Sequence, residues 1–175
     1  MKKVAVLVAN GSEEIEFITP VDVLRRAEGI CCDVFGVGGI ELVGSHKIVL
    51  RADYDVKDLD MNLYDAIVIP GGMPGATNIA NCKEVKEALI IAFNSNKVVG
   101  AICASPAVVL ADNGFIDGRN ATCFPAEDFI KIIKRAKYSA KDVEIDKNLV
   151  TANGPKSAMG FALALCKVLG VNPKI

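Results

Sequence analysis

The feature that most constrains the fold is a series of short apolar runs separated by segments with helical periodicity. Three of these runs, at 4–9, 66–69 and 98–102, contain no charged residue. Continuous apolar runs of this length are typical of parallel strands that are buried on both faces. Strands that alternate with helices predict an α/β fold, in which helices cover both sides of a mostly parallel sheet.

The remaining segments complete the alternating pattern. Helices are expected at 15–27, 85–93, 106–111, 128–133 and 158–169. Further strands are expected at 32–37, 121–124, 143–145 and 149–151, and the segment 38–50 is expected to form a strand pair or hairpin around Gly44-Ser45-His46. No repeat or linker-like stretch interrupts the chain, so the sequence predicts one domain over residues 1–175 with a sizeable core.

Charge and cysteine content limit the classes of function. Twenty Lys and Arg against 21 Asp and Glu leave a net charge of −1, which argues against a nucleic-acid partner or an anionic membrane surface. The first apolar run is too short for a signal peptide or a membrane span, so we expect a cytoplasmic location and reduced thiols. A single histidine excludes a multi-histidine metal site, and no metal or cofactor is expected. No Cys-x-x-Cys pair occurs among the six cysteines, Cys31, Cys32, Cys82, Cys103, Cys123 and Cys166.

Cys103 is the strongest candidate for a reactive group. It follows the apolar run 98–102 directly and precedes Ala104, Ser105 and a helix that begins at Pro106. This is the arrangement of a nucleophile elbow, where small residues allow a tight turn from strand to helix. The helix start would direct amide N–H groups toward the sulfur and favour the thiolate. The alternative is a small structural cysteine in a packed turn, and the position at the strand end favours the functional interpretation.

Glu16 is the candidate proton carrier. It lies between Ile15 and Phe17, and an apolar environment would raise the pKa of its carboxyl and keep it protonated. Such a carboxyl can donate a hydrogen bond to a thiolate or act as a general acid and base. From spacing alone, an ordinary glutamate on a helix face explains this residue equally well. Glu13 and Glu14 are interpreted as compensating the helix dipole.

Glycine-rich segments follow the strands. The segment 69–76 lacks the Gly-Lys-Ser/Thr of a phosphate-binding loop, and its glycines would form either a tight turn or an oxyanion hole of backbone N–H groups. The segment 152–157 is interpreted as a turn and helix cap, and His46 as an exposed turn histidine rather than a catalytic base. Ligands of parallel α/β folds bind beyond the carboxyl ends of the strands. Asn10-Gly11, Gly71-Gly72 and Cys103 are therefore expected along one edge of the sheet.

Together these motifs resemble the DJ-one/ThiJ/PfpI superfamily, and within it the branch of the human parkinsonism-associated protein and the bacterial YajL-type proteins. The matching segments run in the family's order at 11–16, 20–27, 64–72, 75–76, 101–106 and 153–155. The resemblance implies a flavodoxin-like three-layer α/β/α sandwich, related to class I glutamine amidotransferases, that forms a homodimer. It also implies Cys103 as the nucleophilic and oxidisable residue, Glu16 as its protonated partner, and an anion pocket lined by the backbone of Gly72, Gly75 and Ala104.

Several positions depart from the family pattern. Ala104 stands where peptidase-like relatives carry histidine, so no base adjoins the nucleophile and a protease function is weakened. Phe124-Pro125 replaces a His-Pro pair of the human protein, and a pocket arginine of that protein is replaced in the region of His46. Gly154-Pro155-Lys156-Ser157 replaces a more usual Gly-Pro-Gly-Thr. The further candidates for lining the pocket are Arg26, His46, Phe124 and Asn153.

The resulting hypothesis is a stress-response protein that acts as a cofactor-independent glyoxalase or deglycase on methylglyoxal or its adducts, through Cys103 and Glu16. The alternative is a non-enzymatic redox sensor or chaperone that works through oxidation of Cys103 to a sulfinate. A cysteine peptidase is the least favoured interpretation. The expected partners are a small aldehyde or an oxidant and a second copy of the chain.

Overall fold

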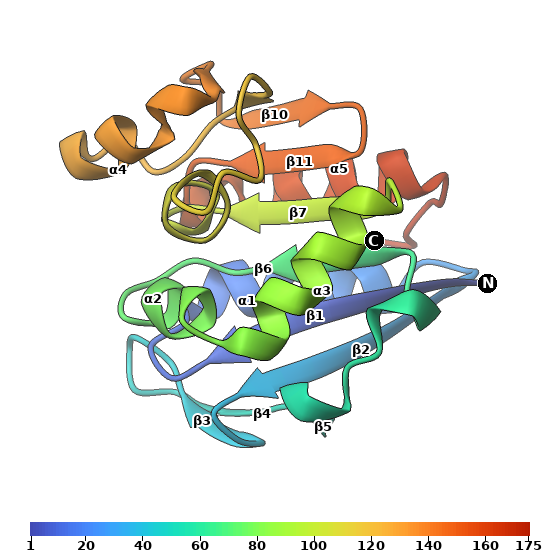
Figure 1. The fold of residues 1–175 in the computed structure, drawn as a ribbon. Helices are drawn as coiled ribbons and strands as arrows, with labels where there is room; N and C mark the ends of the chain where they lie inside the picture. The colour runs from blue at the N-terminus through green and yellow to red at the C-terminus, as the bar shows by residue number, and fades with distance from the viewer.

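The computed structural model describes all 175 residues and forms a seven-stranded sheet between two layers of helices (Figure 1). The strand order is β10-β11-β7-β6-β1-β2-β5. Every neighbouring pair is parallel except β10 and β11, which are antiparallel. The bounds are β1 Lys2–Ala9, β2 Ile30–Val37, β5 Tyr54–Asp55, β6 Ala66–Ile69, β7 Val98–Ile102, β10 Val143–Asp146 and β11 Leu149–Ala152. The predicted flavodoxin-like α/β/α sandwich is confirmed.

The α-helices divide between the two faces of the sheet. In Figure 1, α3 lies in front of the sheet and α1 and α5 lie behind it, and α1 packs against α5. Their bounds are α1 Glu14–Arg25, α2 Gly75–Ala80, α3 Lys83–Asn94, α4 Glu127–Ile132 and α5 Ala158–Leu169. The α5 helix ends where Gly170 adopts a left-handed conformation (φ 74°), which a residue without Cβ adopts readily. The predicted limits of α5 are confirmed, and α1 ends two residues earlier than predicted.

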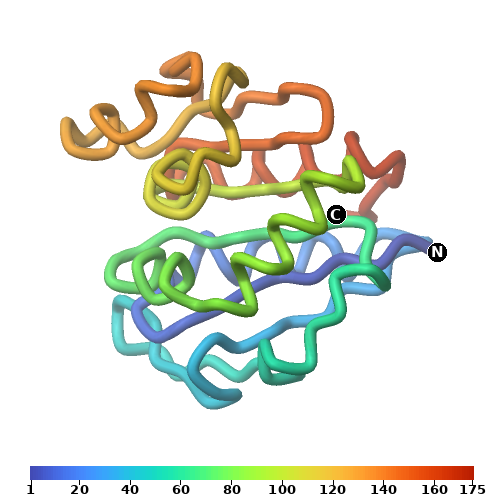
Figure 2. Tube along the Cα trace, in the orientation of Figure 1, coloured from blue at the N-terminus to red at the C-terminus, as the bar shows by residue number.

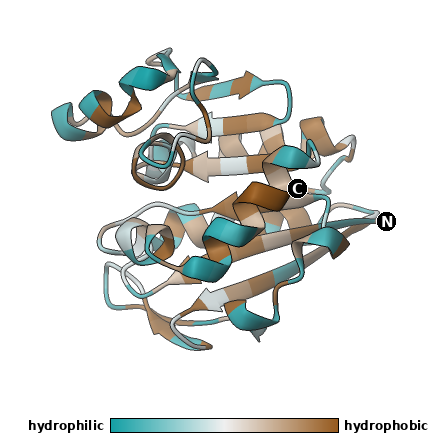
Figure 3. Ribbon diagram, viewed as in Figure 1, coloured by the Kyte–Doolittle hydropathy of each residue, from teal (hydrophilic) through white to brown (hydrophobic).

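Two apolar cores lie on the two faces of the sheet, because successive residues of a strand point to opposite sides. In β1, Ala5 and Leu7 belong to the core beneath α2 and α3, whereas Val4 and Val6 belong to the core beneath α1 and α5. All four side chains are fully buried. Figure 3 shows hydrophobic residues throughout the central strands and hydrophilic ones over much of α4. This burial on both faces is why the apolar runs of the sequence are continuous.

The short elements show where the sequence prediction was right and where it was wrong. The hairpin around Gly44-Ser45-His46 is confirmed as β3 Glu41–Val43 and β4 Val49–Arg51. The predicted strand 121–124 is wrong beyond Ala121: β8 covers only Asn120–Ala121 and pairs with β9 Lys137–Tyr138. The chain leaves the strand because the Phe124 N–H donates to the carbonyl of Cys103 (2.8 Å) instead of joining a ladder. The predicted helix 106–111 is a π-helix, and α2 was not predicted.

The carboxyl ends of the parallel strands form one edge of the molecule, at the left of Figures 1 and 2, and both chain termini lie at the opposite side. No helix is long and apolar enough to cross a membrane.

A cysteine and a glutamate at the carboxyl edge of the sheet

The loops after β1, β6 and β7 interlock at this edge. A Cβ on Gly11 would lie 2.5 Å from the Cδ of Pro74, and a Cβ on Gly71 would lie 2.5 Å from the Cβ of Cys103. Approaches this short exclude any side chain other than hydrogen. The expected meeting of Asn10-Gly11, Gly71-Gly72 and Cys103 at one edge is therefore present in the structure.

Cys103 occupies a strained turn directly after β7. Its φ of 65° lies in the left-handed region, which costs a residue with a Cβ about 1–2 kcal/mol. Its N–H donates to the carbonyl of Ala152 and its carbonyl accepts from Phe124, both at 2.8 Å, so the turn is held from two sides. Ala104 and Ser105 are buried beneath it. This is the backbone geometry of a nucleophile elbow.

Glu16 lies in the first turn of α1 and is fully buried. Its Oε2 accepts a hydrogen bond from the Gly71 N–H (3.0 Å), while its Oε1 is buried without a hydrogen-bond partner. Its own N–H donates to the side chain of Glu13 (2.9 Å), which caps the helix. The helix cap and the Gly71 amide therefore fix the carboxyl beside Cys103.

Burial and mutual repulsion control the ionisation of this pair. Burial raises the pKa of Glu16 to about 7. The hydrogen bond with Cys103 lowers this pKa, and the charge of Glu13 raises it. Burial, followed by the charge of Glu16, raises the pKa of Cys103 to about 12, against the opposing hydrogen bonds of the Gly72 and Ala104 N–H groups. The expected effect of the amide N–H groups is present, since they lower the pKa of Cys103, but burial and the charge of Glu16 outweigh them. With the pKa of the carboxyl near neutrality, the pair is partly ionised at neutral pH and carries at most one negative charge, so one group keeps its proton when the other ionises.

The three glycine and alanine candidates for an anion pocket differ in what they contact. The N–H groups of Gly72 and Ala104 act on the sulfur of Cys103. Gly75 instead begins α2, and a Cβ there would lie 2.4 Å from the backbone N of Ser12. Gly75 thus has a packing role in this structure, and the donors directed at the sulfur come from Gly72 and Ala104.

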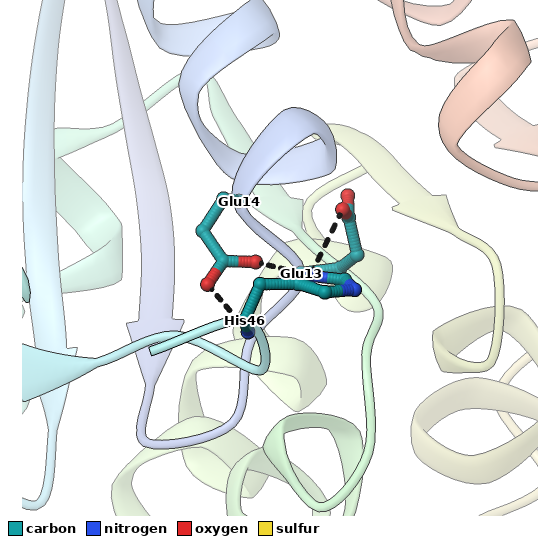
Figure 4. Close-up of side chains that lie close together, drawn as sticks. All are labelled: Glu13, Glu14 and His46. Atoms are coloured by element: carbon teal, nitrogen blue, oxygen red, sulfur yellow. Dashed lines mark hydrogen bonds and ion pairs between the residues drawn. The ribbon is translucent and has the colours of Figure 1, made fainter. Parts of the chain in front are cut away.

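His46 joins the start of α1 from the tip of the β3–β4 hairpin (Figure 4). Its Nδ1 lies 2.8 Å from the Oε2 of Glu14 and 3.7 Å from Glu13, and its backbone N–H donates to Glu14 (2.7 Å). Burial disfavours the charge of Glu14, but these hydrogen bonds outweigh it and lower its pKa to about 2. The hydrogen bond to Glu14 also raises the pKa of His46. The His46 side chain is 69% exposed, as the sequence predicted.

Glu13, Glu14 and His46 are also the residues whose ligand atoms lie close enough together to hold a metal ion. One ligand atom from each of Glu13, Glu14 and His46 lies within 4.8 Å of the others. Glu14 is already occupied, however, by the hydrogen bonds from His46 and Ser45. The arrangement is that of a hairpin tip anchored on a helix start, and the interpretation of Glu14 as mere dipole compensation was incomplete.

The other candidate residues lie in two places. Phe124 and Asn153 border the turn at Cys103. The N–H of Phe124 donates to the carbonyl of Cys103, and Asn153 follows Ala152, whose carbonyl accepts from the Cys103 N–H. Arg26 is the C-cap of α1 and pairs with Asp22 (3.0 Å). It is ten residues beyond Glu16, or about 15 Å along the helix. The prediction that Arg26 lines the pocket is therefore wrong for the site within one chain.

Two residues that position the site were missed. Gly71 donates to Glu16, and a Cβ there would lie 2.4 Å from the Oε2 of Glu16. Ser105 donates through its hydroxyl to the carbonyl of Pro70 (2.6 Å) and thereby joins the ends of β6 and β7. The glycine doublet at 71–72 was a usable signal for the first. No local pattern marks Ser105, because its acceptor is distant in sequence.

The fold and the site define a class of protein: an α/β sandwich with a cysteine at a nucleophile elbow and a buried glutamate against it. The family model described as the DJ-1/PfpI family matches residues 2–168, and the chain belongs to this family. The chain is 36% identical over 171 residues to the Parkinson disease protein 7 homolog of Danio rerio, covering 96% of this chain and 89% of that protein. It is 37% identical over 163 residues to the protein DJ-1 homolog B of Arabidopsis thaliana, covering 93% of this chain but only 37% of that longer protein. The solved structure of oxidized Toxoplasma gondii DJ-1 superposes with a TM-score of 0.91 at 36% identity, covering 97% of this chain and 91% of that one.

Proposed function

We propose that this protein is a cofactor-independent glyoxalase or deglycase in the cellular response to reactive aldehydes, with Cys103 as nucleophile and Glu16 as proton carrier. One observation carries the proposal. A cysteine in a strained turn faces a fully buried carboxyl whose Oε1 has no other hydrogen-bond partner. A buried carboxyl oxygen left without a partner is costly unless it carries a proton that it can donate.

The hydrogen-bond donors favour placing the single charge of the pair on sulfur. If Glu16 keeps its proton, the Cys103 thiolate accepts from the Gly72 and Ala104 N–H groups and from the carboxyl. If Glu16 ionises instead, its carboxylate accepts only the Gly71 N–H and the weak S–H donor. The raised pKa of Cys103 includes the repulsion from an ionised Glu16, which is absent when Glu16 keeps its proton. Three donors on sulfur against two on the carboxylate therefore support the thiolate with neutral Glu16 as the reactive form.

The reaction follows from this form. The thiolate of Cys103 adds to the aldehyde carbon of methylglyoxal, and Glu16 protonates the resulting oxyanion to give a hemithioacetal. The Glu16 carboxylate then removes the C–H proton of that carbon, and an enediolate forms. Glu16 returns this proton to the neighbouring carbon, and the hydroxyl proton of the first carbon passes to the oxygen of the second, which leaves a lactoyl thioester on Cys103. Water cleaves the thioester and releases lactate with the free thiol, so methylglyoxal and water are converted to lactate without an external oxidant.

Backbone amides supply the electrostatic stabilisation. The N–H groups of Gly72 and Ala104 are directed at the reaction centre and are in place before the substrate arrives. Such preorganised donors stabilise an oxyanion without reorganisation in the transition state. The proposed mechanism uses no imidazole: the single histidine, His46, lies in the β3–β4 hairpin and pairs with Glu14 at the start of α1. This also disfavours the cysteine peptidase, which would need a base beside the nucleophile.

Turnover of methylglyoxal by purified, thiol-free protein tests the proposal. We expect Cys103→Ala and Glu16→Gln each to abolish lactate formation. Cys123→Ala is the matched control, because Cys123 is a buried thiol close in sequence to the site but outside the proposed mechanism, and it should retain turnover. Full turnover in either site variant contradicts the mechanism. For deglycase activity, removal of free aldehyde by a scavenger separates true cleavage of adducts from simple depletion of the aldehyde.

A second candidate function, a redox sensor, is supported by the same donors and by the oxidized state named for the Toxoplasma gondii relative. Peroxide would convert the Cys103 thiolate to a sulfenic acid and then a sulfinic acid, with each step consuming one peroxide and releasing water or hydroxide. The amides of Gly72 and Ala104 and a protonated Glu16 would hydrogen-bond the sulfinate oxygens. Mass spectrometry after mild peroxide should find Cys103 oxidised before Cys82, which is similarly half-buried. Equal oxidation of the two thiols removes the basis for this function.

The homodimer also remains a proposal. Ile15 and Ile18 of α1 are 53% and 46% exposed, and Ile48 and Val49 beside the hairpin tip are 52% and 75% exposed. The hairpin tip contacts the start of α1 through His46 and Glu14, so these apolar side chains belong to neighbouring elements that a second copy would cover. Sedimentation should show a dimer that Ile18→Glu dissociates, and a wild-type monomer would contradict it. The predicted cytoplasmic location is likewise proposed, on the basis of six free thiols.

A further inference from the structure

A groove beside Cys103 is not needed by a substrate as small as methylglyoxal. It has a volume of about 390 Å³ and is lined by Phe124, Pro125, Asn153, Gly154, Pro155 and Lys156. A water molecule occupies about 30 Å³ in the liquid, so the groove accommodates a body much larger than a methyl group. The position of the groove and the chemistry of its lining residues together indicate what kind of substituent it would bind.

The groove is built onto the backbone of the nucleophile. The carbonyl of Cys103 accepts from the N–H of Phe124, which forms one wall. The N–H of Cys103 donates to Ala152, whose successor Asn153 forms the other wall. Both backbone hydrogen bonds of Cys103 therefore go to segments that adjoin or form the groove, while Cys103 itself does not line it. A substituent longer than a methyl group, on a carbonyl carbon bonded to the sulfur, would reach from the turn into the groove.

The walls are apolar and stiff. The ring of Phe124 packs over Gly154, where a Cβ would lie 3.3 Å from its Cδ2, and Phe124 remains 41% exposed. Pro125 and Pro155 continue the apolar surface with rings of fixed geometry. Such a surface favours a flat apolar or aromatic body, which can stack against the phenylalanine ring.

Of the two polar side chains that line the groove, Asn153 and Lys156, only Lys156 is free to bind a charged ligand group. The Asn153 amide is engaged, since it accepts from Ser157 (2.6 Å) and donates to Asp142 (2.9 Å). Lys156 is exposed and is the sole charged residue lining the groove, and it forms no ion pair. This lysine is one of the two residues, with Ser157, that depart from the Gly-Pro-Gly-Thr pattern. Its charge complements an anionic group at the outer end of a substrate.

We propose that the groove binds the substituent of an α-oxoaldehyde substrate, and that Lys156 selects substrates whose apolar body ends in a carboxylate. The proposal rests on the proposed function for the reacting carbonyl, and it adds the chemical class of the substituent. Lys156 is a specificity-determining residue in this account and takes no part in the chemistry at Cys103.

Two substrates that differ by one carboxylate group test the selection: phenylglyoxal and para-carboxyphenylglyoxal. We expect the wild type to have the higher kcat/KM for the carboxylated compound. Lys156→Gln should lower the ratio of the two kcat/KM values roughly two- to fivefold, the range for an exposed ion pair. High salt should lower the wild-type ratio similarly. Lys86→Gln, which removes an exposed, unpaired lysine on α3, should retain the wild-type ratio. An unaltered ratio in Lys156→Gln overturns the proposal.

A second measurement does not depend on turnover. The rates at which para-(iodoacetamido)benzoate and iodoacetanilide alkylate Cys103 can be followed by mass spectrometry in wild type and Lys156→Gln. A preference for the carboxylated reagent that falls in Lys156→Gln supports the groove assignment even if no aldehyde is turned over, in which case only the proposed enzymatic function fails. Equal preference in both proteins overturns the groove assignment even if methylglyoxal is turned over.

Discussion

Replacing Glu16 by glutamine removes a buried ionisable group and should change how the stability of the protein depends on pH. Glutamine has nearly the same size, and its amide oxygen can still accept the Gly71 N–H that Glu16 accepts at 3.0 Å. It cannot lose a proton. The variant therefore isolates the cost of the carboxyl's ionisation from its packing.

The magnitude follows from the raised pKa. Burial raises the pKa of Glu16 from 4.5 to about 7. A carboxyl that holds its proton more tightly in the folded state loses stability as the pH rises above the unfolded pKa, and the loss is complete above the folded pKa. At about 1.4 kcal/mol for each tenfold change in proton affinity, the wild type loses about 3 kcal/mol between these two pH values. Because Glu16 and Cys103 are coupled, this loss accompanies the first proton released by the pair, whichever atom releases it.

Urea unfolding of wild type and Glu16→Gln across this pH range measures the effect. We expect the free energy of unfolding of the variant, relative to wild type, to rise by about 3 kcal/mol from acidic to neutral pH. Glu41→Gln is the control, since the side chain of Glu41 is 79% exposed and its difference from wild type should vary little. A difference in the free energy of unfolding between Glu16→Gln and wild type that stays constant with pH would contradict this prediction.

Two further predictions concern the loops around the site. Gly75→Ala should destabilise the protein by about 1–3 kcal/mol, because its Cβ would lie 2.4 Å from the backbone N of Ser12. Gly160→Ala, inside α5 with its nearest contact at 3.4 Å, should instead stabilise it by about 0.5–1 kcal/mol; thermal unfolding that gave both variants the same sign would contradict this. His46 is the single histidine, so its NMR titration is unambiguous: its pKa should lie above 6.5 and fall toward 6.5 in Glu14→Gln. An identical titration in both proteins would show that Glu14 is not the cause.

The central strands β1, β6 and β7 and the nucleophile turn were predictable because their signals are local, whereas the two-residue strand β5 was not predicted. Continuous apolar runs specify strands buried on both faces, and the small residues after Cys103 specify a tight turn. The glycine doublet marked Gly71 as a loop residue, but its hydrogen bond to Glu16 was not predictable, because 55 residues separate the two partners. The same holds for α2, whose six residues are too few for a helical period to stand out.

Two expectations were incomplete for the same physical reason. The amides after β7 were expected to favour the thiolate and do so, but burial and an ionised Glu16 oppose them. The strand 121–124 was expected from its apolar composition, but Phe124 gives its N–H to the carbonyl of Cys103. In each case a contact between segments distant in sequence overrides a local preference. The prediction that Arg26 lines the pocket failed for a different reason, because a motif match identifies a residue without placing it beside the site.

The central claim is that Glu16 keeps its proton while Cys103 carries the negative charge. Titration of the thiolate absorbance, with Cys103→Ala subtracted to remove the other five cysteines, tests it most directly. If Cys103 carries the charge, its thiolate signal appears below the ~8.5 of a free thiol as the pair releases its first proton, and Glu16→Gln moves that signal to higher pH. If thiolate forms only above the ~8.5 of a free thiol and Glu16→Gln does not raise that value, then the carboxylate carries the charge and the proposed roles of Cys103 and Glu16 are wrong.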